Sequence, residues 1–376
     1  MTNRSRTCAA AVMFLMAASR PAGAQLGGLI NRGQQVREQV RAVTISDEDE
    51  QAIGAGVSQR VRVRYGVVQD PAVHKYVTLT GLALAKASPR PDLPWTFIVL
   101  DTDGVNAFAA PGGSIHITRG ALALVQDESE LAGVLAHEIT HVTEKHTISA
   151  IQKNKLVAAG ANEALKGNAA LLNQYVDKAF ELVYAGFGRA EELESDSRGI
   201  ALADTVGYAP GSLGSFLTRL TERNRSSSEK QGLFASHPQM TERLDKLSGK
   251  IAADRLGATA RLAERYQKAI TYKPRPLAGV ALVPEGSAGL AGGGDGKDGA
   301  KKDDAPAKKG GFALPGLARG SASGSSEKRS AEVTASGGSR GVDTERNAKG
   351  GPSPALVVVT VSAADLAAFK KEGGLR

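Results

Sequence analysis

Residues 128–143 read ESELAGVLAHEITHVT, and this stretch decides the fold of the chain. Acidic residues open it, where the partial positive charge of a helix N-terminus favours them. Apolar side chains then recur at helical spacing, at Leu131, Val134, Leu135, Ile139 and Val142. The pattern predicts a helix with one apolar face. His137 and His141 lie four residues apart beside that face, so both side chains project to the same side of the helix.

Glu138 follows the first of these histidines, and the pattern His-Glu-x-x-His is typical of zinc peptidases. In such a site the two histidines bind the metal, and the carboxylate acts as general base on a water molecule. The chain holds six histidines, so a chance match to the bare pattern is uncommon. The alternative at this point is a pair of core histidines satisfied by hydrogen bonds, with Glu138 exposed.

A catalytic zinc site needs a third protein ligand and an open position for water. Residues 188–196 read GRAEELESD and predict a helix on which Glu192 and Asp196 share one side. Glu192 is the candidate ligand. Asp196 is the candidate hydrogen-bond acceptor for the outward nitrogen of a ligand histidine. A solvated acidic helix face is the ordinary alternative for such a run.

The surrounding sequence predicts a mainly helical domain with a small β-sheet. Residues 95–100 and 114–118 read as strands. The predicted helices are 47–65, 71–87, 121–126, 189–206 and several more within 150–186 and 211–274. The fold class is therefore α+β: a mainly helical, zincin-type metallopeptidase domain with its small β-sheet next to the active-site helix, followed by a disordered tail.

Residues 1–24 have the composition of a secretory signal peptide. Arg4 and Arg6 precede a short apolar run, and Ala22-Gly23-Ala24 offers a cleavage site of small residues. The run is too short to span a bilayer and no later segment is apolar enough, so we expect no transmembrane span after signal removal. The single cysteine, Cys8, would leave with the signal.

Composition and the His-Glu-x-x-His motif together predict four further segments, namely an N-terminal linker at 25–45, the metallopeptidase domain at 46–276, a low-complexity linker at 277–354 and a C-terminal strand–helix at 355–376. Small and charged residues dominate the second linker and cannot offset its conformational entropy by burial, so we expect disorder there. A strand at 355–361 and the short helix after it cannot bury themselves and should dock elsewhere. One hypothesis is an inhibitory tail on the substrate edge of the sheet; the alternatives are a docking tag for another protein and a loose end.

The formal net charge is +8, but much of the lysine and arginine falls in low-complexity sequence. Aromatic content is low, and no nucleic-acid-binding motif is visible. We therefore expect no nucleic-acid partner.

Four segments share their order with a known family: NAFAAPGGSIHITRGAL at 106–122, HEITH at 137–141, RAEELESD at 189–196 and SHPQMTER at 236–243. In these segments the chain resembles the HtpX and CAAX-prenyl-protease (Ste-type) zinc metallopeptidase family, above all its soluble, exported BepA-like branch. The resemblance covers roughly residues 46–274. It implies an exported zinc metalloendopeptidase that hydrolyses peptide bonds of misfolded envelope proteins in the periplasm of a Gram-negative bacterium.

The resemblance implies a role for each matched residue. One zinc ion (Zn2+) per chain would be bound by His137, His141 and Glu192. Glu138 would be the general base that acts on zinc-activated water.

Outside this ligand set, Asp196 would hydrogen-bond a ligand histidine, and Arg243 would orient the segment that carries His237. His237 itself would stabilise the oxyanion or cover the zinc in a resting state. The substrate backbone would pair with the strand formed by Asn106, Ala107, Phe108 and Ala109.

The chain departs from the family pattern at Ala110, Gly188 and Ser195, which bears on positioning and substrate choice more than on the metal site. The partners implied are protein or peptide substrates and the outer-membrane assembly machinery. The alternative function is a latent or non-proteolytic chaperone or scaffold for outer-membrane protein assembly.

Three further histidines have weaker claims on the site. His116 alternates with two isoleucines on its strand, so it faces away from them and is predicted to be a surface or structural residue. His146 follows His137 by nine residues, which is two and a half helical turns, so it is predicted to point away from the metal. His74 is predicted to lie on the surface.

Overall fold

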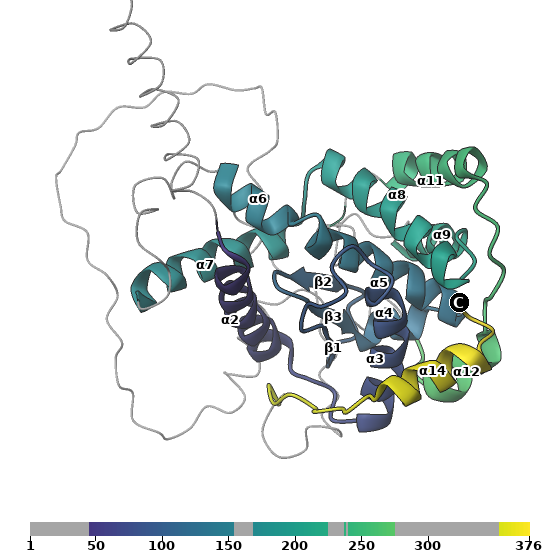
Figure 1. The fold of residues 1–376 in the computed structure, drawn as a ribbon, viewed down its shortest axis with the longest axis horizontal. Helices are drawn as coiled ribbons and strands as arrows, with labels where there is room; N and C mark the ends of the chain where they lie inside the picture. The colour runs from purple at the N-terminus through teal and green to yellow at the C-terminus, as the bar shows by residue number, and fades with distance from the viewer. Residues whose placement is uncertain (1–44, 154–167, 225–236, 238–239, 275–352) are drawn as a thin grey trace, which may run out of the picture. The chain divides into compact units, whose positions relative to one another are not determined.

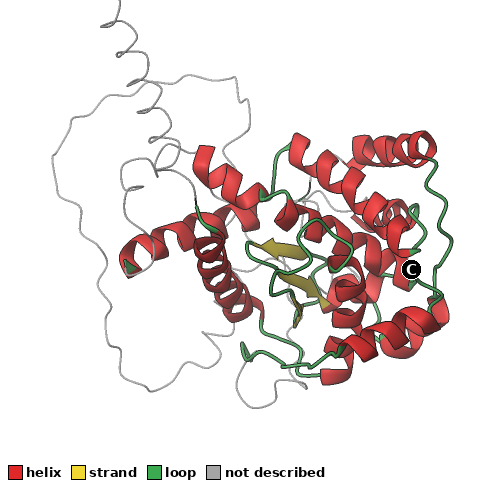
Figure 2. Cartoon of the chain, viewed as in Figure 1, coloured by secondary structure: helices red, strands yellow, loops and turns green. Residues whose placement is uncertain are grey.

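The computed structural model describes residues 45–153, 168–224, 237, 240–274 and 353–376. The predicted signal peptide, nearly all of the N-terminal linker and most of the low-complexity linker lie outside the described residues. Within them the predicted α+β class is confirmed, because helices surround one small sheet (Figure 2). Among the described residues, no helix combines the length and the apolar run that a membrane crossing requires.

The described sheet has three strands in the order β1-β3-β2, namely β1 (Thr96–Leu100), β2 (Ala107–Ala110) and β3 (Ser114–Thr118). β3 runs parallel to β1 and antiparallel to β2. β2 is therefore an edge strand of the described sheet, which is the position that pairing with a substrate backbone requires.

The described helices are α2 (Asp47–Tyr65), α3 (Pro71–Ala85), α4 (Arg119–Leu124), α5 (Glu128–Thr143), α6 (His146–Lys153), α7 (Ala169–Ala185), α8 (Arg189–Val206), α9 (Ser212–Asn224), α11 (Met240–Asp254), α12 (Ala263–Ala269) and α14 (Ala363–Glu372). The bounds of α2 and α8 equal the predicted ones, and α3 ends two residues before its predicted end. The side chain of Ser46 starts α2 and that of Asp127 starts α5, each by accepting a backbone N–H from the first turn.

Both faces of the sheet are buried (Figure 1). One face joins a core cluster with α3 and α5, to which the sheet contributes Phe97, Val99, Ile115 and Ile117. The other joins a second cluster with α2 and α7, to which it contributes Ile98, Leu100, Phe108 and Ala110. Every described strand residue except the first of β1 and the first of β3 is buried, so the sheet is an interior layer rather than a surface.

His116 lies on the face of the sheet that α2 covers. It points away from its isoleucine neighbours, as predicted, but the surface alternative is wrong because the side chain is fully buried. Its Nε2 lies 2.9 Å from Oγ of Ser58 on α2. Burial lowers the pKa of His116 to about 3, so the imidazole is neutral and structural at neutral pH.

His74 is also buried, and its predicted surface position is wrong. The chain before α3 runs back along β1, where the N–H of Val68 donates to the carbonyl of Val99. This backbone covers the first turn of α3, and Nε2 of His74 lies 2.9 Å from the carbonyl oxygen of Val68. A loop that folds over a helix face leaves no periodic signal in the sequence of the helix.

α5 is the central helix, and every residue from Glu128 to Val142 is buried. It packs most extensively against α8. At the crossing, a Cβ atom on Gly199 would lie 3.0 Å from the backbone nitrogen of His137, so glycine permits the close approach. The crossing brings the first half of α8 against the turn of α5 that carries the two histidines.

The N-terminal end of α5 is held by a buried carboxylate. Glu128 is fully buried and accepts hydrogen bonds from the hydroxyls of Tyr76 and Tyr208, each at 2.6 Å. The guanidinium of Arg265 on α12 donates to both of its oxygens. This network ties α3, α12 and the loop after α8 to the start of the histidine-bearing helix.

The C-terminal segment, residues 353–376, docks on this network. α14, yellow in Figure 1, packs beside α3 and α12. Phe369 is buried there, edge-on to Tyr76 with ring centroids 6.1 Å apart. The Cζ atom of Arg265 lies 4.0 Å from the centroid of the Phe369 ring. The expectation that this segment docks on a folded surface is confirmed, and the surface belongs to the same chain.

The predicted strand at 355–361 is wrong, whereas the helix after it is present with a capping box formed by Ser362 and Asp365. The N–H of Val67 donates to the carbonyl of Ser353, but no ladder follows. Val357, Val359 and Val361 are half-buried between exposed residues, so packing of side chains explains the alternation that predicted a strand. Since Val67 bridges to Leu100 of β1, these contacts lie beside β1 and not beside β2, the predicted substrate edge.

Replacing Phe369 with alanine should release α14 and lower the free energy of unfolding by up to about 3 kcal/mol. The loss is limited because the segment can detach as a unit while the domain stays folded. Thermal denaturation and hydrogen exchange of residues 363–372 measure the two effects. Val358→Ala is the control, since that side chain is 87% exposed and should change neither. Full protection of α14 in Phe369→Ala would contradict the assigned anchor.

Candidate metal centre

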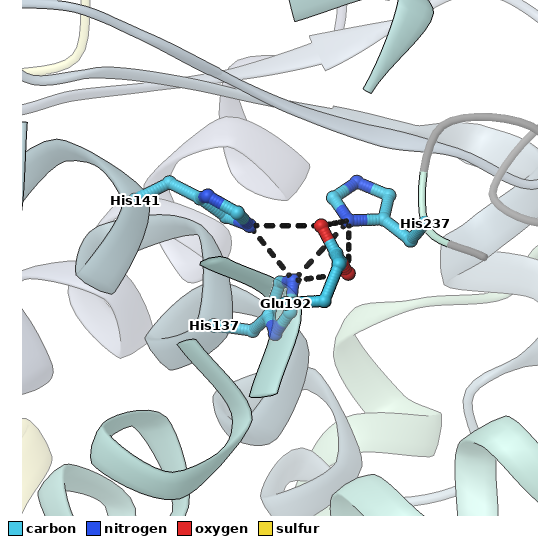
Figure 3. A group of neighbouring side chains, drawn as sticks. All are labelled: His137, His141, Glu192 and His237. Atoms are coloured by element: carbon cyan, nitrogen blue, oxygen red, sulfur yellow. Dashed lines mark hydrogen bonds and ion pairs between the residues drawn. The ribbon is translucent and has the colours of Figure 1, made fainter. Parts of the chain in front are cut away.

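Four buried side chains from separate parts of the chain converge on one point (Figure 3). His137 and His141 come from α5, Glu192 from the first turn of α8 and His237 from the segment before α11. One ligand-type atom of each lies within 4.8 Å of all the others. Nε2 of His137 is 3.1 Å from Nε2 of His141 and 3.3 Å from Nδ1 of His237. The structure thus brings together the three predicted ligands and the predicted fourth residue.

The arrangement fits a tetrahedral metal ion. Atoms bound at about 2.0–2.1 Å to a tetrahedral zinc ion lie roughly 3.3 Å from one another. Oε1 of Glu192 lies 3.5 Å from Nε2 of His141, and Oε2 of Glu192 lies 3.6 Å from Nε2 of His137. Both distances are close to that spacing. Two imidazole nitrogens whose lone pairs face each other repel, and a cation bound between them removes this repulsion. Imidazole nitrogens together with a carboxylate oxygen are a typical set of zinc ligands.

Asp196 and Arg243 contact the donor side chains on the side away from the point where these converge. Nδ1 of His137 donates to Asp196 at 2.9 Å, and the guanidinium of Arg243 donates to both oxygens of Asp196 at 2.7 Å. Arg243 also lies 3.0 Å from Glu192 and donates to the carbonyl of His237 at 3.3 Å. Burial raises the pKa of Asp196, but the hydrogen bonds from Arg243 and His137 outweigh it and hold the pKa at about 2.

Glu138 lies beside the group without being part of it. Its side chain is buried, and Oε1 has no hydrogen-bond partner among the described residues. The nearest cationic candidate is Nε2 of His237, 3.6 Å from Oε1. Burial raises the pKa of Glu138, against the opposing influence of His237 and His137. A buried carboxylate with an unused oxygen and a raised pKa is suited to accept a proton.

The charges and hydrogen bonds within the donor group keep Glu192 in its anionic form. Burial alone would raise the pKa of Glu192, but the charge of His237 and the hydrogen bonds of His141 and His237 hold it well below its usual range. Burial lowers the pKa of His141 well below its usual value. Burial likewise opposes the charged form of His237, yet Glu192 and Glu138 raise its pKa overall. His237 therefore acts as the counter-ion of two carboxylates in this arrangement.

His146 is not part of the donor group, as predicted, but the helical spacing from which that prediction was made is wrong. α5 ends at Thr143, and Lys145 takes a positive φ of 55° that turns the chain before α6. The nine-residue spacing is therefore not helical, and Nδ1 of His146 lies 2.9 Å from Nδ1 of His141. Phe187 was also missed; its ring stacks on His141 with centroids 4.3 Å apart. The sequence pattern predicts neither contact. No glycine marks the end of α5 before His146, and Phe187 lies outside α8, so helical spacing does not apply to it.

The predicted substrate-binding residues Asn106, Ala107, Phe108 and Ala109 lie at and within β2. Contacts with α5 place this strand next to the histidine-bearing helix. Its four residues are at most 4% exposed, so the edge is closed in this arrangement. Ala110, where the chain departs from the family pattern, ends the strand and is fully buried.

Comparison with known proteins finds relatives of the part of the chain that carries this site. Residues 71–251 match Peptidase family M48. The chain is 27% identical to the putative beta-barrel assembly-enhancing protease of Vibrio cholerae, over 54% of this chain and 44% of that protein. It is 27% identical to the beta-barrel assembly-enhancing protease of Escherichia coli, over 54% and 43%. Metalloprotease YcaL of Escherichia coli is 29% identical over 57% of this chain and 84% of its own length.

The chain spans less than half the length of the assembly-enhancing proteases that it matches. The predicted zinc metallopeptidase class is confirmed for the matched domain by the family and by the named metalloprotease relatives. The predicted zinc cofactor is confirmed by the same family match together with the buried donor group. Peptidase family M48 is a narrower description than the HtpX and CAAX-protease resemblance in the sequence.

Proposed function

We propose that this chain is a zinc-dependent endopeptidase whose site consists of His137, His141, Glu192 and Glu138, and the match of residues 71–251 to Peptidase family M48 supports this proposal. The observation that carries the proposal is the convergence of three buried donor side chains beside a buried carboxylate with a free oxygen. The proposed substrates are envelope proteins, chiefly misfolded ones, in the periplasm. The names of the relatives, which are beta-barrel assembly-enhancing proteases, support this choice.

The roles proposed for the side chains follow from their positions. When bound, zinc would supply Lewis-acid activation of water. Oε1 of Glu138 would take the proton of the attacking water and later pass it to the leaving amine. His237, which lies in the donor group with Nε2 3.6 Å from Oε1 of Glu138, would donate to the developing oxyanion. Asp196 and Arg243 would hold His137 and Glu192 in place.

Substrate would add as a strand to β2, with main-chain hydrogen bonds that carry little sequence preference. Since Ala107 and its neighbours in β2 are buried, this addition requires the segments that cover the edge to move first. The proposed domain boundaries are those of the sequence analysis, with 46–276 as the peptidase domain and 1–24 as a signal peptide.

The close contact of His237 favours a second candidate, a latent enzyme or non-proteolytic scaffold in outer-membrane protein assembly. Nδ1 of His237 lies 2.9 Å from both oxygens of Glu192, so it stands where an open position would otherwise admit water. A resting state of this kind would bind zinc without cleaving peptides. Such a state and the active one differ in the placement of one imidazole.

Metal analysis of the purified protein, paired with cleavage of casein, tests the proposal. One zinc per chain and cleavage that a chelator removes and added zinc restores are the expected results. Zinc without cleavage, with cleavage recovered in His237→Ala, would favour the latent state. Absence of zinc after reconstitution would overturn both candidates.

A further inference from the structure

His146 occupies a position that the proposed mechanism does not use. It is 6% exposed and begins α6, immediately after the turn at Lys145. Its Nδ1 lies 2.9 Å from Nδ1 of His141, and its Nε2 lies 3.4 Å from a carboxylate oxygen of Glu194 on α8. A buried imidazole between a candidate metal ligand and a carboxylate needs an explanation beyond packing.

The direction of these hydrogen bonds follows from the orientation of His141. Nε2 of His141 faces the donor group, 3.1 Å from Nε2 of His137 and 3.5 Å from Glu192. An imidazole that binds a metal through Nε2 carries its proton on Nδ1. That N–H points at Nδ1 of His146, which must therefore be the acceptor. The proton of His146 is then on Nε2, where it can point to Glu194.

We propose that His146 is a positioning residue that fixes the tautomer and the ring orientation of His141 for zinc. The inference rests on the proposed function, because His141 is a ligand only if the site binds metal. The other histidine of the pattern has a matching support, since Nδ1 of His137 donates to Asp196. Each α5 histidine thus has its outward N–H engaged, one by a carboxylate and one by an imidazole.

A neutral acceptor suits this side of the site. Three carboxylates, those of Glu138, Glu192 and Asp196, already lie around the α5 histidines. An imidazole accepts the N–H of His141 without adding a further buried negative charge. Phe187 stacks on the face of the same ring, with a tilt of 20° between the two ring planes, so the hydrogen bond and the stacking together restrain the orientation of His141.

Zinc affinity in three variants of the full chain, measured by competition with a chelator of known affinity, tests the role of His146. In His146→Ala, zinc should bind about 10–100-fold more weakly, the usual cost of removing such a partner. His146→Asn should restore affinity, because its Oδ1 stands near the place of Nδ1 and accepts the same hydrogen bond. His146→Gln should not, because its amide lies near the place of Nε2. Thr147→Ala is the control, a buried neighbour that should leave the affinity unchanged.

Equal weakening in the asparagine and glutamine variants, or unchanged affinity in all three, would overturn the inference. If a variant fails to fold, the wild-type protein still provides a test. Histidine-selective 15N NMR should show scalar coupling between Nδ1 of His141 and Nδ1 of His146 across their hydrogen bond. Absence of that coupling also overturns the inference. Failure of the proposed function is distinct, because the wild-type protein would then bind no zinc or cleave no casein.

Discussion

Glu138→Gln should lower the rate of peptide cleavage by about 10²–10⁴-fold while the protein keeps one zinc per chain, since general acid–base groups contribute on this scale. Glutamine matches glutamate in volume, so the buried site should keep its packing. Glutamine cannot act as the general base, and Oε1 of Glu138 is buried with no hydrogen-bond partner among the described residues. Casein cleavage measures the loss of activity, and the metal content of the same preparation measures the retention of zinc.

The matched control is Glu144→Gln, at the C-terminal cap of the same helix. Glu144 lies 3.3 Å from Arg198 at a partly exposed position, so its replacement should leave cleavage and zinc unchanged. Cleavage at the wild-type rate in metal-loaded Glu138→Gln would remove Glu138 as the general base. Loss of zinc in that variant would instead give the carboxylate a role in binding the metal.

Sequence patterns predicted the elements whose residues act within one helix or strand. The start of α2 follows from the capping side chain of Ser46, and the end of α8 follows from the left-handed Gly207. Both signals act within a few residues of the helix end. The pair His137 and His141 was accessible for the same reason. Glu192 was a candidate ligand from its spacing with Asp196, with a solvated acidic face as the alternative, and the resemblance then assigned it to the histidine pair. His237 came from the resemblance alone, because helix periodicity carries no information between α5, α8 and the segment before α11.

The predictions were wrong where tertiary contacts, rather than the local sequence pattern, determine the position of a residue. The position of His146 depends on the positive φ of Lys145, a conformation that glycine usually marks. The burial of His74 depends on backbone from outside α3. The valine-rich residues 355–361 have strand propensity but no ladder, since strand formation also depends on an available partner. Each error reflects a tertiary contact that overrides local preference.

The buried guanidinium of Arg243 should be the most costly side chain of the site to remove. Arg243→Ala should lower the free energy of unfolding by about 3–5 kcal/mol, the usual effect of breaking a buried ion pair from one side. Arg243 is 1% exposed and contacts Asp196, Glu192 and the backbone of His237. Its loss leaves two buried carboxylates without their shared cation, so zinc affinity should fall as well. Denaturant unfolding in the presence and absence of zinc separates the two effects.

Arg189→Ala provides the matched comparison because Arg189 also bridges α8 to α11, through both oxygens of Glu242. That pair is exposed, and solvent screening makes such pairs weak, so its loss should change the unfolding midpoint little. Arg243→Lys should fall between wild type and alanine, because an ammonium keeps the charge but cannot donate to both oxygens of Asp196 in the geometry of a guanidinium. If Arg243→Ala unfolds at the same midpoint as Arg189→Ala, the buried network does not stabilise the site. If only the metal-bound form is destabilised, Arg243 organises the ligands rather than the fold.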